Sequence, residues 1–461
     1  MKQYFTFFYL ISLLLLSSCA TPPVEEFTMK HAIAINDDGS PYALTIKTAT
    51  DIIPENQYVY SNHVNSIINS IKKSGKTNIL IFVFGGMNSL DATLKKSYIL
   101  ANAITNTSDY YPILINWESS LFDAYYEHLM WNRRGLDSVY LGPPLAPFYF
   151  IADIGRAISR LPVNLVFQTI SVTKDYDMNS EIDESEKVSI DKLKLRVYSG
   201  KDYTPGYLYF FKFLVYTCGF PIRLITTPMI DACGKSAWDI MVKRTRTAFQ
   251  KQQENEVSIN KKTKQIIFLP PNGAFALLMD ALKKLHDEDN KYFFTLIGHS
   301  LGPVMLNEMI RRYPNLPYRN IVYLAAACTI RDTRYALAPY ANTHTNFTFY
   351  NLCIHENADR YDMMWFAALP RGSILEWIDS FLGDPLTYDD RTLGKWSNSL
   401  RVLQSIEPKF RSKVVIKAFG LYDPKTNNII LDEPQQHTDF SDPRLQFWNP
   451  AFWQVKTLIK K

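Results

Sequence analysis

One segment of this chain has the residue types and spacing for nucleophilic chemistry: Gly298-His299-Ser300-Leu301-Gly302. It directly follows the apolar run 292–297 and precedes an apolar segment with helical periodicity, which predicts a cramped turn between a strand and a helix. Small residues on both sides of Ser300 suit such a turn, because larger side chains would collide with the neighbouring backbone. A serine held there in a strained conformation presents its hydroxyl above the sheet, where it can act as a nucleophile.

The pattern resembles the nucleophile elbow of the α/β-hydrolase superfamily, and the resemblance extends from about Asn78 to the C-terminus, interrupted by long insertions. It implies a mostly parallel central sheet flanked by helices. It also implies a nucleophile after the fifth strand, an acid usually after the seventh and a histidine after the eighth. The apolar patterns can be arranged in that order, with a helix at 304–312 and strands at 112–117, 265–269, 321–326, 347–354 and 413–419.

A serine hydroxyl is a poor nucleophile at neutral pH unless a base removes its proton during attack. In the order that the resemblance implies, His437 is the base, because it alone among the eight histidines follows the last predicted strand. Asp359 follows the strand at 347–354 by one short loop, and it would fix the imidazole tautomer and stabilise the imidazolium. Glu356 and Asp362 are competing carboxylates, and capping of the next helix is the other role open to Asp359.

An acyl-transfer mechanism also needs N–H donors aimed at the developing oxyanion. The resemblance assigns one donor to Leu301 and the second to an early loop. Segment 78–88 is a predicted buried strand that runs into a pair of glycines, and it resembles the His-Gly loop of lipases and esterases. Phe84 stands where many members of the family have histidine. Gly86 or Met87 would supply the second amide, and the alternative is a tight turn without chemistry.

The N-terminus resembles a bacterial lipoprotein signal peptide, with Lys2, the apolar run 4–16 and then Ser17-Ser18-Cys19. The apolar run is too short to span a bilayer comfortably, and small residues before a cysteine suit cleavage. The resemblance implies that Cys19 becomes the first residue and carries a thioether-linked diacylglycerol and an N-acyl chain such as palmitate. Together these chains would anchor the protein stably to the membrane. Ala20 favours the outer membrane, since aspartate there favours inner-membrane retention. An ordinary cleaved signal and an uncleaved anchor are the alternatives.

The composition agrees with a folded enzyme, because 461 residues that are 47% hydrophobic can bury a large core. Lys and Arg total 50 against 45 for Asp and Glu, a balance that does not favour nucleic acid as a partner. No CxxC, HExxH or phosphate-loop pattern occurs, so no metal or cofactor is expected. Cys218 and Cys233 are the candidate disulfide pair in an oxidising periplasm, whereas Cys328 and Cys353 are expected to be buried free thiols.

This chain is longer than a minimal hydrolase of the family it resembles. The additional residues lie mainly between the predicted strands at 112–117 and 265–269, and they predict a large helical cap. Within it, the apolar stretches 139–170 and 207–230 flank the polar run 174–194. Charges and prolines inside 207–230 weigh against a transmembrane helix. Two interpretations remain open for these stretches: the buried core of a cap, or a lid or membrane-contacting surface that shapes an acyl pocket.

The sequence therefore predicts an α/β-hydrolase fold with a large helical cap. The expected divisions are a signal peptide (1–18), a lipidated tether (19–34), the first part of the core (35–117), the cap (118–262), the core with the elbow (263–360), a second helical insertion beside the cap (361–411) and the last part of the core (412–461).

The expected function is that of a membrane-anchored serine hydrolase in the bacterial envelope, which cleaves a carboxylic ester, a lipid or another hydrophobic acyl compound. Ser300, His437 and Asp359 would carry the reaction through an acyl-enzyme. An acyltransferase with the same triad and a catalytically inert binding protein are the alternatives. The expected partners are a hydrophobic substrate and the membrane, and the oligomeric state is open.

Overall fold

The structure is a computed structural model that describes residues 25–42, 44, 57–130, 132–133, 136–137, 141–174, 196–198, 206–251, 258–259, 266–268, 272–360, 362, 369–402, 405–419 and 433–454. The predicted signal peptide and Cys19 lie outside these residues.

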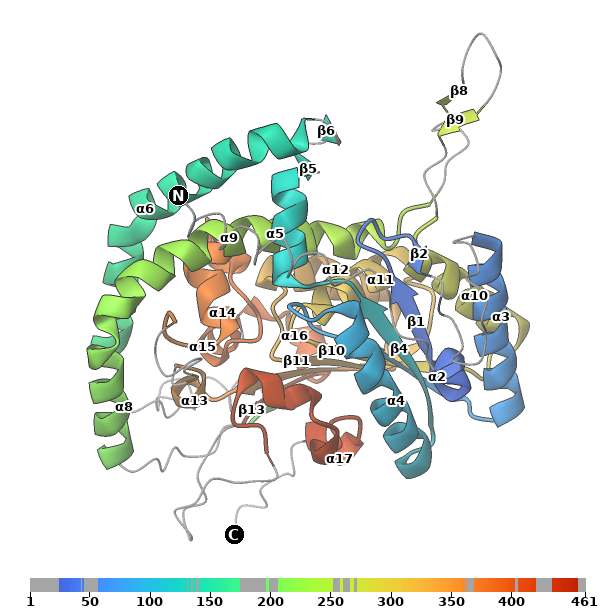
Figure 1. Cartoon of the computed structure of the whole chain (residues 1–461). Helices are drawn as coiled ribbons and strands as arrows, with labels where there is room; N and C mark the ends of the chain where they lie inside the picture. The colour runs from blue at the N-terminus through green and yellow to red at the C-terminus, as the bar shows by residue number, and fades with distance from the viewer. Residues whose placement is uncertain are drawn as a thin grey trace, which may run out of the picture.

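A nine-stranded sheet forms the centre of the molecule (Figure 1). Its strand order is β2-β1-β4-β3-β10-β11-β12-β13-β7, and each neighbouring pair is parallel except β2 with β1. The strands are β1 (Ala32–Ile35), β2 (Pro41–Tyr42), β3 (Asn78–Val83), β4 (Tyr110–Trp117), β7 (Arg196–Tyr198), β10 (Phe293–His299), β11 (Tyr318–Leu324), β12 (Thr348–Ile354) and β13 (Val414–Phe419).

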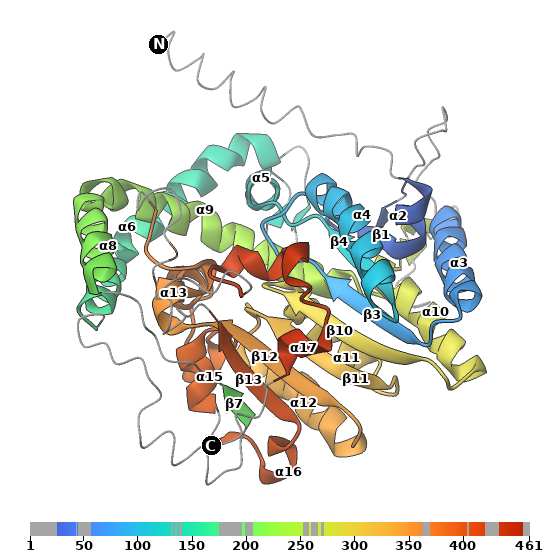
Figure 2. The same ribbon diagram turned by 90° about the horizontal axis from the view of Figure 1, so that it is seen from below.

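Helices cover both faces of the sheet (Figure 2), which explains why its middle strands are apolar along nearly their whole length. Side chains alternate along a strand, so Ile79 and Ile81 of β3 pack in one core layer, and Leu80 and Phe82 pack in the other. The first layer contains α3 (Gln57–Ser74), α9 (Phe220–Thr247), α10 (Ala274–Glu288), α11 (Gly302–Arg312) and α12 (Ile330–Thr343). The second contains α4 (Leu90–Thr107), α14 (Ile374–Trp377), η3 (Ile378–Leu382), η6 (His437–Ser441) and α17 (Pro450–Trp453).

The predicted α/β class is confirmed, but residues expected to form a tether belong to the fold. Residues 26–35 form α2 (Glu26–His31) and β1, and Ala32–Ile35 are almost fully buried beside β4. The strand expected at 265–269 is β9 (Ile266–Phe268), which pairs with β8 (Ser258–Ile259) in a hairpin outside the central sheet. In the central sheet, β3 pairs directly with β10 on one side and with β4 on the other, so β9 does not lie between β3 and β10.

The insertion after β4 begins as a helical cap, with α5 (Leu121–Met130), α6 (Gly142–Lys174) and α8 (Gly206–Cys218) on the outside of the molecule (Figure 1). A short antiparallel pair, β5 (Asn132–Arg133) with β6 (Leu136–Asp137), joins α5 to α6. Two parts of this expected cap lie in the central fold instead: β7 pairs with β13 at the sheet edge, and the second half of α9 buries Ile240 and Met241 in the core. Among the described residues, no helix is long and apolar enough to cross a membrane.

The second insertion packs beside the cap, as predicted: Arg160 of α6 forms an ion pair with Asp384, and Leu382 of η3 lies against Gly234 of α9. Besides α14 and η3 it contains η4 (Tyr388–Asp390), α15 (Trp396–Val402) and α16 (Pro408–Arg411). Cys218 and Cys233 are not joined by a disulfide. The predicted state of Cys328 and Cys353 is confirmed, since both are buried free thiols.

Candidate active site

Ser300 lies in the tight turn between β10 and α11, with a left-handed φ of 54°. Its backbone is fixed on both sides, because its N–H donates to the Leu324 carbonyl at 2.9 Å and its own carbonyl accepts from the Ala327 N–H at 2.6 Å. A Cβ on Gly302 would lie 2.4 Å from the Val83 carbonyl oxygen, and one on Gly298 would lie 2.8 Å from the Pro303 nitrogen. The turn therefore needs glycine on both sides of the serine, and the strain at Ser300 matches the predicted elbow.

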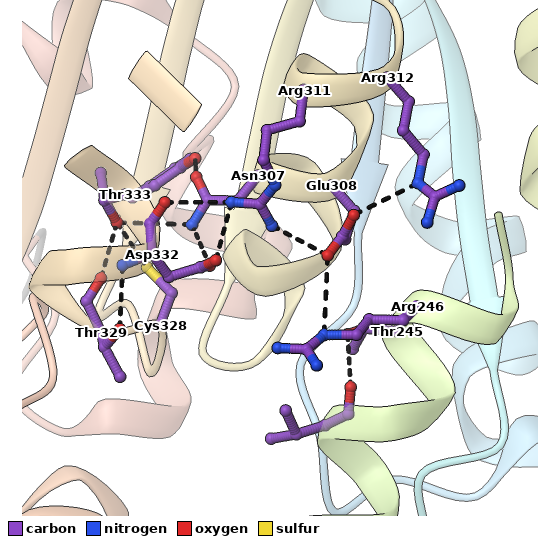
Figure 3. A network of polar contacts seen from close by, with 12 residues as sticks. Thr245, Arg246, Asn307, Glu308, Arg311, Arg312, Cys328, Thr329, Asp332 and Thr333 are labelled. Carbon is purple, nitrogen blue, oxygen red and sulfur yellow. Dashed lines mark hydrogen bonds and ion pairs between the residues drawn. The ribbon is translucent and has the colours of Figure 1, made fainter. Parts of the chain in front are cut away.

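The helix after Ser300 is anchored by a network of polar side chains (Figure 3). Asn307 of α11 donates to Asp332 at 2.6 Å and accepts from Tyr323 of β11 at 2.5 Å. Arg311 donates to the same Asp332 at 2.8 Å, and Glu308 forms an ion pair with Arg311 at 3.0 Å. These contacts tie α11 to β11 and α12, so the elbow is supported by a rigid shell.

The loop after β3 lies directly against the serine, since a Cβ on Gly85 would be 2.8 Å from the Ser300 Cβ. Two side chains fix the Gly85 carbonyl of this loop: its oxygen accepts from the side-chain amide of Asn88 at 3.2 Å and from the Ser119 hydroxyl at 3.4 Å. Because the C=O and N–H of a trans peptide point in opposite directions, the Gly86 N–H points away from Asn88 and Ser119.

Two of the three predicted oxyanion donors remain available. None of the hydrogen bonds of the described residues uses the N–H of Leu301 or Gly86. Leu301 is the N-cap of α11, where a free N–H and the helix dipole both favour negative charge. The Met87 N–H instead donates to the Ser119 carbonyl at 2.8 Å, so Met87 is not free to bind an oxyanion.

His437 begins η6, after β13, and it is buried beside the elbow. Its carbonyl lies 3.0 Å from Nε2 of His299, and the two imidazole rings have centroids 5.1 Å apart. Neither ring nitrogen of His437 has a hydrogen-bond partner among the described residues. Burial, with a smaller contribution from His299, holds the pKa of His437 well below its usual value, so the ring is neutral in the free protein.

The carboxylate that contacts His437 is Asp362, one of the two competitors of Asp359. Its Oδ2 accepts from the backbone N–H of His437 at 3.4 Å, and burial raises its pKa. The predicted pairing of Asp359 with His437 is not among the hydrogen bonds and ion pairs of the described residues. Glu356 is turned elsewhere, since it accepts from the Ser397 N–H at 3.2 Å.

Asp359 lies in α13 (Glu356–Arg360), and its side chain belongs to a separate buried group of charges. Burial raises the pKa of its carboxyl to about 7, against the opposing effects of Lys395 and of a hydrogen bond with Ser373. The negative charge of Glu376 also raises the pKa of Asp359, and Glu376 itself forms an ion pair with Lys395. Asp359 is therefore part of the packing between α13 and the second insertion.

This buried carboxyl predicts a pH dependence of stability. With a pKa of about 7 in the folded protein and about 4 in the unfolded chain, the folded state binds more protons between those values. The free energy of unfolding must therefore fall as the pH rises through this window. We expect Asp359→Asn, which has no proton to lose, to gain roughly 2 kcal/mol relative to wild type between pH 5 and pH 8 in urea denaturation. Parallel pH profiles of the two proteins would contradict this.

The other described histidines have different surroundings. His31 contacts the Pro112 carbonyl at 2.9 Å, His63 the Met29 carbonyl at 2.7 Å and His128 the Asp153 carboxylate at 2.9 Å. Among the described residues, no group of three or more His, Cys, Asp or Glu side chains is placed to hold a metal ion.

Sequence reasoning missed Ser119, and it identified Gly85 only as one of a pair of glycines. Ser119 follows β4 and reaches back to the glycine loop, and Gly85 makes the close approach to Ser300. The glycine pair gave a signal for the second, but no local pattern singles out Ser119, because its partners lie more than thirty residues away.

Comparisons with known proteins find no relative. No protein-family model matches this chain, and neither does any curated protein or solved structure. Its resemblance to a family therefore rests on its residues and their geometry alone.

Proposed function

We propose that this chain is an α/β-hydrolase-type serine hydrolase that cleaves a carboxylic ester of a hydrophobic acyl compound. The observation that carries the proposal is Ser300, a non-glycine residue in a left-handed conformation between two glycines whose replacement the backbone would not accommodate. Strain of this kind persists only where the surrounding structure enforces it, and it is concentrated at functional sites.

The order of elements also supports the family proposal. If β7 is set aside, β10 is the fifth strand of the sheet in chain order, β12 the seventh and β13 the eighth. Ser300 follows the fifth, Asp359 and Asp362 follow the seventh, and His437 follows the eighth, as in the hydrolase superfamily.

In the proposed reaction, Oγ of Ser300 attacks the ester carbonyl carbon while neutral His437 takes the hydroxyl proton. The N–H groups of Leu301 and Gly86 stabilise the oxyanion of the tetrahedral intermediate. Its collapse breaks the bond to the alcohol oxygen, which leaves with the proton from His437. Water, activated by the same base, then cleaves the acyl-enzyme and releases the carboxylic acid.

We assign the orienting carboxylate to Asp362 rather than Asp359. Asp362 already lies against residue 437, whereas Asp359 interacts with Ser373 and the Lys395 group. A carboxyl group with a pKa of about 7 would also be protonated in a large fraction of molecules at neutral pH, which makes Asp359 a poor partner for an imidazolium.

The compartment and the anchor belong to the same proposal. Lipidation at Cys19 would hold the enzyme at the bacterial envelope membrane, where hydrophobic acyl substrates are found. Intact mass measurement of protein extracted from membranes tests this, because a Cys19→Ala variant would lack the added acyl mass.

Labelling of the detergent-solubilised protein with a fluorophosphonate probe tests the catalytic proposal, since such probes react with activated serines whatever the substrate. We expect one labelled site, mapped to Ser300 by mass spectrometry, and no label on Ser300→Ala. A folded wild-type protein that stays unlabelled in detergent and with vesicles would support the inert binding protein. A labelled enzyme would next be tested on esters graded by acyl length.

A further inference from the structure

The outer face of α6 is apolar where a water-exposed helix is normally polar. Between residues 142 and 166, each exposed residue is uncharged, and the large exposed side chains are Leu145, Phe148, Phe150, Ile151, Ile158, Val163 and Val166. Phe148 is 69% exposed and Ile151 is 66% exposed. An amphipathic helix on a soluble protein has the opposite arrangement, with its apolar stripe toward the core.

The neighbouring helices continue this face. The exposed large apolar residues are Phe210, Phe211 and Leu214 of α8, together with Phe220, Ile222, Leu224, Ile225 and Met229 of α9. Over the same stretch of α9 the buried positions are polar, since Arg223 is 1% exposed and Thr227 and Asp231 are fully buried. We call the exposed apolar residues of α6, α8 and the first turns of α9 the apolar arch.

The charged residues of α6 between 142 and 166 are Asp153, Arg156 and Arg160, and all three pair with residues of the protein. Asp153 lies 2.9 Å from His128 of α5 and accepts from Ser236 of α9 at 3.3 Å. Asn164 donates to Asp231 at 3.0 Å, and Arg156 donates to backbone carbonyls of α9. The helices thus meet through polar contacts and present hydrocarbon outward, which is the polarity of a protein that faces lipid.

We propose that the apolar arch inserts into the acyl region of a lipid membrane surface. A protein partner would be matched by a polar rim with hydrogen bonds, and the exposed positions of α6 offer almost none, whereas lipid tails require none. The helices that carry the arch lie at the outside of the molecule in both views (Figures 1 and 2), and the residues of the arch are exposed, so a flat bilayer can reach them. The proposed contact is interfacial, with these helices lying at the membrane surface.

The N-terminal segment is consistent with this occupant. Glu25, the first described residue, is the sixth residue after Cys19, and six residues extend over at most roughly 20 Å. If Cys19 carries lipid, which rests on the proposed function, the folded protein cannot leave the bilayer surface. The polarity of the arch is independent of that step.

The arch is also connected to the candidate active site through α9. This helix runs from the exposed Ile225 to Met241, whose sulfur lies 3.7 Å from the position of a Cβ on Gly86. A continuous helix therefore links the arch to the glycine loop that lies beside Ser300.

Vesicle sedimentation tests the arch without the lipid anchor. The protein would begin at residue 19 with Cys19→Ser, which keeps every described element, and would carry Ser300→Ala so that no turnover occurs. We expect it to sediment with vesicles of phosphatidylethanolamine and phosphatidylglycerol. The pair Phe148→Ser with Ile151→Ser, and separately Ile222→Ser with Ile225→Ser, should each lower the partition constant by roughly tenfold or more.

Two exposed apolar residues outside the arch provide matched controls. Tyr335 is 61% exposed and Leu386 is 93% exposed, and Tyr335→Ser and Leu386→Ser should change the partition constant less than twofold. Circular dichroism establishes that each variant is folded. The proposal is overturned if the parent protein does not sediment, if arch and control variants bind equally, or if the arch variants only dissociate a dimer. The catalytic proposal is tested separately, by fluorophosphonate labelling in detergent of the same proteins with Ser300 present. A protein that is labelled but does not bind vesicles would overturn the membrane proposal alone.

Discussion

Asp362→Asn is expected to lower the rate of fluorophosphonate labelling and of ester hydrolysis by about 10⁴-fold, with little change in stability. The amide would still accept from the His437 N–H, so the loop should keep its position. It would not stabilise an imidazolium, however, because an amide carries no charge. The buried environment of His437 makes that loss severe, because burial already disfavours the charged ring.

Asp359→Asn is the matched control, because it makes the same chemical change three residues away. We expect a labelling rate within tenfold of wild type at pH 8, together with the change in stability described above. The comparison uses second-order labelling rates, which need no knowledge of the substrate. A large loss in Asp359→Asn with a small one in Asp362→Asn would reverse the assignment and return Asp359 to the role that the family pattern gives it.

Gly302→Ala is expected to destabilise the protein by about 3 kcal/mol and to abolish labelling of Ser300. The added methyl group would lie 2.4 Å from the Val83 carbonyl oxygen, a backbone atom of β3 that cannot rotate away. Relief requires α11 to move relative to β3, which displaces the Leu301 N–H and changes the backbone at Ser300. Urea denaturation and probe labelling measure the two effects separately.

Gly155→Ala gives the opposite expectation for the same substitution. A Cβ on Gly155 meets nothing within 4 Å, and the residue lies inside α6, where alanine is favoured over glycine by about 1 kcal/mol. We expect this variant to be slightly more stable and fully labelled. An unchanged Gly302→Ala protein would remove the steric argument for the elbow.

The central fold follows from local patterns. Apolar runs predict β4, β10, β11 and β12, because parallel strands buried on both faces need apolar side chains on both, and the alternating segment 413–419 predicts β13. The elbow follows from the glycines around Ser300, since a Cβ at either position would meet backbone atoms. Both predictions depend only on neighbours along the chain.

The rest depends on contacts that no local pattern encodes. β7 is three residues long, and its place beside β13 is fixed by pairing with a distant segment. Asp359 and Asp362 both follow the same predicted strand, so the sequence offers both as the acid of the triad. Their contacts distinguish them, because Asp359 interacts with Lys395 and Ser373, whereas Asp362 accepts from the His437 N–H. The disulfide at Cys218 and Cys233 suited an oxidising compartment, but the two cysteines lie on different helices and are not bonded.

The pairing of β7 with β13 has a consequence for biogenesis. Tyr198 pairs with Lys417, so the two strands are separated by more than two hundred residues of chain, and closing so long a loop is slow. A chain that emerges from its N-terminus at about 5–20 residues per second must wait 10 s or more for that partner. During this interval β7 has no partner in the sheet, whereas α6 can already pack against α5 and α9, which precede β13 in the chain. We expect the edge of the sheet formed by β13 and β7 to be completed last, because β13 is the last strand of the sheet in chain order.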